Sequence, residues 1–334
     1  MSEPEVLYAA ALVDGLGEAL EKDERVHLIG QYFLGLTSHR TLMAQLRNRF
    51  ASRVYDPPIA ENGYVGLAIG AALSGLRPIV DLATASFIFQ AFSQIANEAA
   101  NAHYMTGGQA RIPAIFHLNH GIRIGGAAQH SHSPQAMLWN TPGLQIMIPS
   151  SPTDVRGLLR TALKLENPTM WIDHVRLFDT TGPGIEDGKA IPFGQASVRR
   201  PGGDVTIVAT SLMVHRALEA ADILADKGVS AEVVDPRTLV PLDESTILES
   251  VRKTGHLVVA DECHLSCGVA AEIAARVAEA GFDLLRGPIR RVATPDVPIP
   301  FSRPLEEHIE PTTSKIVAAC LQALGEGRRS EVMQ

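Results

Sequence analysis

The sequence predicts an α/β protein made of two doubly wound domains. Apolar, strand-like segments alternate with amphipathic helical segments in both halves of the chain, which is typical of parallel sheets covered by helices on both faces. A segment rich in glycine, proline and charge separates the two halves. We therefore expect a first domain over residues 1–180, a linker over 181–203 and a second domain over 204–334.

The second half shows the alternation most plainly. Each apolar segment is followed by a helical pattern that stops at or near a glycine, and glycine is the preferred residue just beyond the end of a helix. The expected strands are 204–210, 230–236 and 256–262, and the expected helices are 215–228, 243–255 and 268–281.

The first half has the same alternation with longer loops. One helix has a clear start, because Ser151 suits the capping position, Pro152 the first helical position and Asp154 the first turn. The N-terminus is acidic and amphipathic, which fits a first helix. The expected strands are 76–83, 112–118, 144–150 and 169–174, and the expected helices are 93–105 and 151–166.

An isolated acid stands out in the stretch DPPIAENGYVGLAIGAALSGLRPIV, residues 56–80. Glu61 is followed by nineteen residues whose only charge is Arg77. A surface helix would carry charges along its outer face, so the pattern predicts a buried helix with a buried acid at its start. A simpler interpretation is that Glu61 stabilises the N-terminus of this helix, where a negative charge is favourable.

Composition excludes several classes of protein. The chain of 334 residues has a formal net charge of −8 and no run of lysine and arginine, so we expect no nucleic-acid partner. No apolar run is long enough for a membrane span, and the acidic start is unlike a targeting peptide, so the cytoplasm is the expected location. Three cysteines indicate no disulfide framework, and Cys263 and Cys267 are expected to be ordinary loop residues.

A histidine-rich stretch is the remaining local signal. His117, His120, His130 and His132 fall within sixteen residues. Three interpretations are open: a solvated polar loop, a metal site, or one histidine that moves protons on a substrate. The glycine-rich segment 182–190 lacks the spacing of a phosphate-binding loop.

Taken together, residues 56–108, 127–159, 235–247 and 294–302 are similar to the beta subunits of thiamine-diphosphate-dependent 2-oxo acid dehydrogenases. That family includes the pyruvate, branched-chain and acetoin dehydrogenase complexes. The resemblance covers almost the whole chain. It implies a pyrimidine-binding transketolase-like domain followed by a transketolase C-terminal-like domain.

The resemblance also assigns site residues. Glu61 matches the glutamate that hydrogen-bonds N1′ of the aminopyrimidine of thiamine diphosphate, and an acid among apolar residues is suited to share a proton. Phe87 matches the ring that stacks on the pyrimidine, although core packing is an alternative and Phe89 lies close by. Gln90 is expected to line the same pocket. His130 matches the active-site histidine that stabilises the oxyanion and assists acyl transfer.

Some parts of the family pattern are missing. The chain lacks the motif that holds Mg²⁺ and the diphosphate, a half of the site that the family keeps on a separate alpha subunit, so an α2β2 assembly is implied. Gln31 stands where relatives have a glutamate of a proton relay. Asn167 falls in a loop that binds potassium in relatives, but Leu165 replaces a common aspartate. Asp296 falls in the region that docks the acyltransferase core, or is a structural turn residue.

Three functions follow in order of preference. The first is the decarboxylating component of a 2-oxo acid or acetoin dehydrogenase, which passes an acyl group to a lipoyl domain. The second is a two-component transketolase-type transferase with an aldehyde acceptor, favoured by the altered loop at Gln31 and by the extra histidines, which suit ketose-like substrates. The third, a non-catalytic scaffold, is the weakest because Glu61, Phe87 and His130 occur together.

Overall fold

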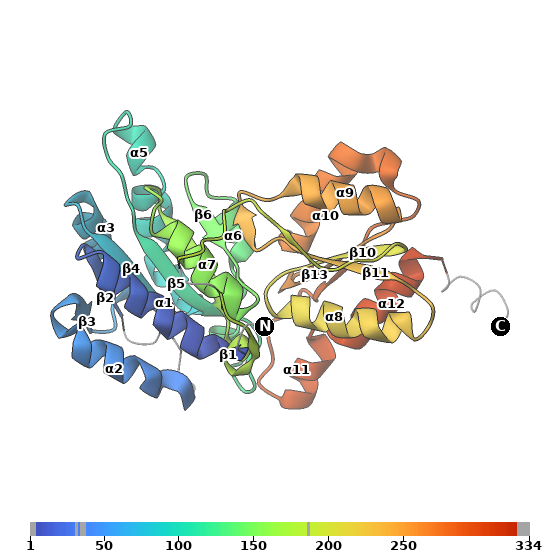
Figure 1. Ribbon diagram of the computed structural model, residues 1–334, viewed down its shortest axis with the longest axis horizontal. Helices are drawn as coiled ribbons and strands as arrows, with labels where there is room; N and C mark the ends of the chain where they lie inside the picture. The colour runs from blue at the N-terminus through green and yellow to red at the C-terminus, as the bar shows by residue number, and fades with distance from the viewer. Residues whose placement is uncertain (1–4, 31–32, 34–37, 186–187, 326–334) are drawn as a thin grey trace. The chain divides into compact units, whose positions relative to one another are not determined.

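The computed structural model describes residues 5–30, 33, 38–185 and 188–325, which form two compact units. Both are α/β, as predicted (Figure 1). The first unit contains the described residues up to Arg123 together with Gln129–Phe193 and Leu239–Pro241, and the second contains Ile124–Ala128, Gly194–Thr238 and the described residues from Leu242 onward.

A seven-stranded sheet forms the centre of the first unit. Its strands are β2 (Val26–Ile29), β3 (Val54–Tyr55), β4 (Arg77–Thr84), β5 (Ile115–His120), β6 (Gln145–Met147), β7 (Thr169–His174) and β12 (Thr238–Val240). Their order is β12-β6-β7-β5-β4-β2-β3, and the pairings from β6 to β3 are parallel. Every residue of β5 and β7 is buried, as expected for central parallel strands covered on both faces.

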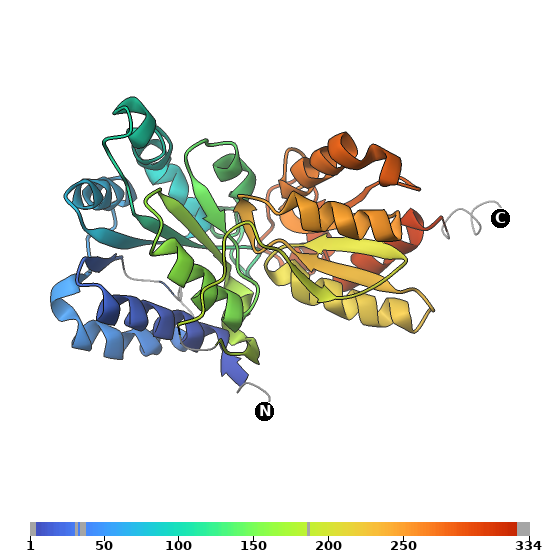
Figure 2. The ribbon, with the colours of Figure 1, turned by 45° about the horizontal axis from the view of Figure 1, so that its top comes forward.

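Helices cover both faces of this sheet. They are α1 (Tyr8–Lys22), α2 (Leu42–Arg49), α3 (Glu61–Leu73), α4 (Ile88–Ser93), α5 (Ala102–Met105), α6 (Gln135–Trp139) and α7 (Pro152–Ala162). Helices α1 and α7 pack side by side on one face, with α3 and α4 packed together on the other (Figure 2). Helix α7 begins as predicted, because the Ser151 hydroxyl accepts a hydrogen bond from the Asp154 backbone N–H and Pro152 follows it.

Two predictions about these helices need correction. The helix expected over 93–105 is interrupted by a π-helical segment, Gln94–Ala99. The prediction of a buried α3 holds for Glu61, which is 9 % exposed, but is wrong for one helix face: Leu67 is 60 % and Leu73 56 % exposed. Apolar composition indicates that a helix face avoids water, but the described part of the chain leaves this face uncovered.

The second unit has a five-stranded sheet in the order β14-β13-β10-β11-β9. Its strands are β9 (Ser197–Arg200), β10 (Val205–Ala209), β11 (Ala231–Asp235), β13 (Leu257–His264) and β14 (Arg290–Thr294). Strand β9 is antiparallel at the edge and the others are parallel. The three predicted strands of this half are confirmed.

Helices cover the second sheet on both faces as well (Figure 1). Helix α8 packs with α12, and α9 packs with α10. The predicted end of α9 is confirmed at Gly255, which adopts the left-handed conformation with φ 74°. The helices are α8 (Leu212–Ala225), α9 (Glu244–Thr254), α10 (Val269–Gly281), α11 (Arg303–Ile309) and α12 (Thr313–Ala323).

The segment expected to link the domains contains regular structure. Strand β8 (Thr181–Pro183) pairs antiparallel with β1 (Glu5–Leu7) and belongs to the first unit, whereas β9 belongs to the second. The chain passes from the first unit to the second at residue 194. Within the described residues, no helix has the length and apolarity that a membrane crossing requires.

Candidate active site

The first unit contains a pocket between the N-terminus of α3, where Glu61 lies, and the C-terminal end of β4. In open α/β sheets, ligands bind beyond the carboxyl ends of the strands. The wall combines two buried acids, two aromatic side chains and several small or apolar residues. The lining residues are Gly30, Pro57, Pro58, Ile59, Glu61, Tyr64, Asp81, Ala83 and Phe87.

The Glu61 carboxyl group is buried but has no assigned internal partner. Ala60, the residue that caps α3, offers no side-chain hydrogen bond, and in the described chain no hydrogen bond or ion pair engages Glu61. Burial, with the charges of Glu61 and Asp81, raises the pKa of the Tyr64 hydroxyl above its ordinary value. The pocket is therefore acidic, and the Glu61 carboxyl group can be engaged by a ligand there.

Phe87 lines this pocket and contacts His130. The Phe87 ring contacts the His130 imidazole edge-on, with ring centroids 5.6 Å apart and planes at 78°. The Thr84 hydroxyl donates to the backbone carbonyl of His130 at 3.3 Å. His130 itself is exposed. Glu61 and Phe87 thus line one pocket, and His130 lies against the Phe87 ring.

The neighbouring aromatic and amide side chains lie elsewhere. Phe89 is 52 % exposed and contacts the His132 ring at 5.2 Å, while Ser86 hydrogen-bonds His132 Nδ1 at 2.8 Å. Gln90 is exposed on α4 and is absent from the pocket lining given above. Of the two phenylalanines, Phe87 is the one that faces the pocket.

Two of the four clustered histidines are core residues. His117 is fully buried and hydrogen-bonds Asp173 at 3.0 Å and Asp81 at 3.4 Å. His120 is 2 % exposed, and its Nδ1 lies 2.9 Å from the Gln135 amide nitrogen. Sequence reasoning missed the two aspartates, although each is a lone acid in an otherwise apolar strand, a signal that could have found them.

The guanidinium group of Arg77, from β4, binds the loop that holds Asn167. The Arg77 guanidinium donates to the Leu165 carbonyl at 2.9 Å and pairs with the Glu166 carboxylate. The exposed Asn167 accepts at its carbonyl from the Thr169 hydroxyl at 3.4 Å. In the described part of the chain, no three histidine, cysteine or acidic side chains gather as a metal site. The potassium loop stays a prediction.

Two further predictions concern single residues. Gln31 lies outside the described residues. The Asp296 carboxylate accepts hydrogen bonds from the backbone N–H of Ser266 at 3.0 Å and from its hydroxyl at 2.6 Å. These bonds hold the pKa of Asp296 below its usual value. Asp296 therefore ties two loops of the second unit together.

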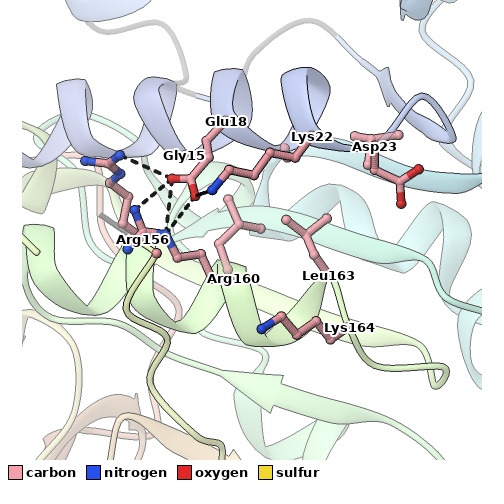
Figure 3. Close-up of a pocket in the computed structure, with 12 residues that line it drawn as sticks. Gly15, Glu18, Lys22, Asp23, Arg156, Arg160, Leu163 and Lys164 are labelled. Carbon is pink, nitrogen blue, oxygen red and sulfur yellow. Dashed lines mark hydrogen bonds and ion pairs between the residues drawn. The ribbon is translucent and has the colours of Figure 1, made fainter. Parts of the chain in front are cut away.

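A second pocket, of about 220 Å³, lies between α1 and α7 (Figure 3). Its cations are mostly engaged by one acid: Glu18 accepts hydrogen bonds from Lys22 at 2.7 Å, Arg160 at 2.8 Å and Arg156 at 3.2 Å. This network joins the two helices, so we assign it to packing rather than to ligand binding.

Two family models match the chain, one in each half. The family model "Transketolase, pyrimidine binding domain" matches residues 5–177, and "Transketolase, C-terminal domain" matches 194–316. The chain is 40 % identical over 329 residues to the Bacillus subtilis acetoin:2,6-dichlorophenolindophenol oxidoreductase subunit beta, covering 95 % of this chain and 96 % of the relative. The chain belongs to the beta-subunit family of thiamine-diphosphate-dependent 2-oxo acid dehydrogenases. The resemblance and the fold predicted from the sequence are thereby confirmed.

Other members and one solved structure extend this comparison. The Rickettsia felis pyruvate dehydrogenase E1 component subunit beta is 40 % identical over 316 residues, covering 94 % of this chain and 97 % of the relative. A solved structure named "Split gene transketolase, inactive beta4 tetramer" matches with a TM-score of 0.78 and 25 % identity, covering 96 % of this chain and 98 % of that one.

Proposed function

We propose that this beta chain, together with a separate alpha subunit, forms the decarboxylating component of a 2-oxo acid or acetoin dehydrogenase, cleaves its substrate next to a carbonyl and passes the acyl group to a lipoyl domain. The observation that carries the proposal is the pocket shared by Glu61 and Phe87 with His130 at its edge. Relatives at 40 % identity named for acetoin and pyruvate dehydrogenases support the same reaction class.

The pocket residues suit the pyrimidine end of thiamine diphosphate. When bound, the cofactor supplies the nucleophilic carbon that attacks the carbonyl of the substrate. Glu61 would share a proton with N1′, and Phe87 would stack on the ring. Gln90, exposed on α4 and outside the pocket lining, is kept as a proposed contact of the cofactor. His130 would donate a proton to the oxyanion that forms on the substrate.

The sequence lacks the motif that holds Mg²⁺ and the diphosphate in the family, and among the described residues no three histidine, cysteine or acidic side chains gather as a metal site. We assign that half of the site to the alpha subunit of an α2β2 assembly in the cytoplasm. The exposed apolar face of α3 is consistent with a chain that is covered in such an assembly. The proposal also includes a potassium ion bound at the Asn167 loop. It further includes a lipoyl acyltransferase core as a partner of the assembly.

A transketolase-type transferase is the second candidate. The solved relative named a split-gene transketolase favours it, since that protein matches almost the whole chain at a TM-score of 0.78. Such an enzyme would pass a two-carbon unit to an aldehyde without lipoamide. We prefer the dehydrogenase because the identity to dehydrogenase beta subunits is 40 % rather than 25 %. The burial of His117 and His120 also removes two of the histidines that favoured a sugar substrate.

The acceptor decides between the two candidates. We would purify the chain with its alpha subunit and offer pyruvate, branched-chain 2-oxo acids or acetoin, with either a lipoyl domain or an aldehyde as acceptor. We expect acyl transfer to the lipoyl domain, measured by mass spectrometry. Turnover with the aldehyde and none with the lipoyl domain would overturn the dehydrogenase in favour of the transferase.

A further inference from the structure

A buried charge cluster lies directly behind the Glu61 pocket. His117, on the central strand β5, is placed between a carboxylate on each neighbouring strand: Asp81 on β4 and Asp173 on β7. Its Nδ1 lies 3.4 Å from Asp81 Oδ1, and its Nε2 lies 3.0 Å from Asp173 Oδ2. All three side chains are completely buried.

Neighbouring side chains donate hydrogen bonds to the cluster but bring no charge to it. From α1, the Tyr8 hydroxyl donates to Asp173 at 2.6 Å, and the Trp171 indole N–H donates to the same carboxylate at 2.9 Å. The Phe33 ring stacks on His117 with centroids 5.3 Å apart. The described groups that face His117 are thus two acids and neutral donors or rings. A cation between two buried carboxylates is favourable, and among the described contacts of this cluster the imidazole is the group that can carry a positive charge.

The protonation of His117 agrees with this charge balance. Burial alone would lower its pKa, but hydrogen bonds and charges from Asp173 and Asp81 together raise the pKa of His117 to about 9. The imidazole is therefore cationic at neutral pH and loses its charge only in alkaline solution.

The cluster reaches the pocket through Asp81. The same Asp81 Oδ1 that contacts His117 accepts a hydrogen bond from the Ala83 backbone N–H at 2.8 Å. Ala83 has a positive φ of 56°, and the register between β4 and β5 shifts between Asp81 and Thr84. Thr84, the last residue of this bulge, donates to the His130 carbonyl. Bulges beside active sites re-aim the chain in this way.

The backbone of Gly30 packs closely against the backbone of Asp81. Gly30 adopts φ +115°, and a Cβ atom there would lie 2.6 Å from the Asp81 carbonyl oxygen. Asp81, Ala83 and Gly30 all line the pocket beside Glu61. The shape of this wall therefore depends on where the Asp81 carboxylate is held.

We propose that His117 is a positioning residue of the active site: as a buried cation it fixes Asp81, and through Asp81 the β4 bulge that forms one wall of the Glu61 pocket and anchors His130. This inference rests on the proposed function, since it assumes that the pocket receives the pyrimidine of thiamine diphosphate. A merely structural histidine would contribute to stability without affecting cofactor affinity.

The test is the affinity of the assembled complex for thiamine diphosphate between pH 6.5 and 9.5, measured by fluorescence titration. We expect His117→Asn to weaken binding at least 10-fold at neutral pH and to remove most of the pH dependence. The wild type should approach the affinity of the variant as the pH passes about 9. His120→Asn is the matched control, a buried imidazole on the same strand that contacts Gln135, and it should follow the wild type.

A second variant tests the same role if His117→Asn fails to fold. Asp173→Asn removes one of the two charges that raise the pKa of His117, so the loss of affinity should move to lower pH. Equal affinity and equal pH profiles in all four proteins would overturn the positioning role alone. A wild-type complex that binds no thiamine diphosphate would overturn the proposed function and this inference together.

Discussion

Glu61 shows how one residue combines several local properties. It begins a helix, where the backbone N–H groups favour a negative charge, yet its side chain is 9 % exposed and engages no described partner. A carboxylate used only to stabilise the helix end has no need of burial. Phe87, on the wall of the same pocket, gives it an aromatic neighbour, whereas Phe89 two residues later faces solvent.

Replacing Glu61 by Gln tests this assignment. In the assembled complex we expect exchange of the cofactor C2 proton to fall by about 100-fold or more, since the amide cannot move a proton. Hydrogen exchange followed by NMR measures this rate, and the mass of the complex should not change. Glu24→Gln, an exposed acid of the same unit, serves as the control. Normal exchange in the Glu61 variant would remove the residue from the mechanism.

At the scale of elements, α1 and α7 are joined by an ion-pair network as well as by apolar contacts. Glu18 on α1 receives Arg156 and Arg160 from α7 (Figure 3). Burial alone would raise the pKa of Glu18, but hydrogen bonds from Arg160, Lys22 and Arg156 lower it to about 2. Because the folded-state pKa is lowered, the stabilisation is complete above the ordinary pKa of 4.5 and is lost as the pH falls toward 2.

Glu18→Gln should therefore destabilise the chain in a pH-dependent manner. We expect a loss of about 1–2 kcal/mol in unfolding free energy at neutral pH, allowing for solvent screening of these partly exposed charges. The difference from the wild type should shrink as the pH falls below 4.5. Urea unfolding at several pH values measures it. Glu21→Gln, whose pair with Arg49 is more exposed, should have a smaller effect, and equal effects would contradict this account.

At the scale of the whole molecule, the proposed function makes this chain one half of an active site. The first unit supplies an acid, a ring and a histidine, and the described chain supplies no metal cluster. The apolar face of α3 is open, with Leu67 and Leu73 more than half exposed. The open apolar face fits a subunit that packs against another chain.

The isolated chain should accordingly be folded but inactive. We expect no decarboxylation by the purified beta chain with thiamine diphosphate and Mg²⁺, and full activity when the alpha subunit is added. Light scattering of the mixture should give the mass of two copies of each chain. Turnover by the beta chain alone at a comparable rate would show that the site does not need a second polypeptide.

Several features could be predicted from local sequence because their causes are local. Apolar runs of strand length determine β5, β7 and β10, and capping chemistry determines the start of α7 at Ser151 and the end of α9 at Gly255. Composition and long ordered motifs sufficed for the α/β class, the family and the burial of Glu61. Strand and capping signals depend on neighbours within a few residues, and motifs are read along the chain. Neither requires knowledge of the fold.

Other features were decided only by the tertiary structure, because they depend on distance in space. Strand order places His117 between Asp81 and Asp173, whose sequence separations from it are 36 and 56 residues. The same histidine looked like a member of a solvated or ligand-binding loop in the sequence. Charge balance in a dry core requires partners within hydrogen-bond reach, and only the packing of β4, β5 and β7 brings them there.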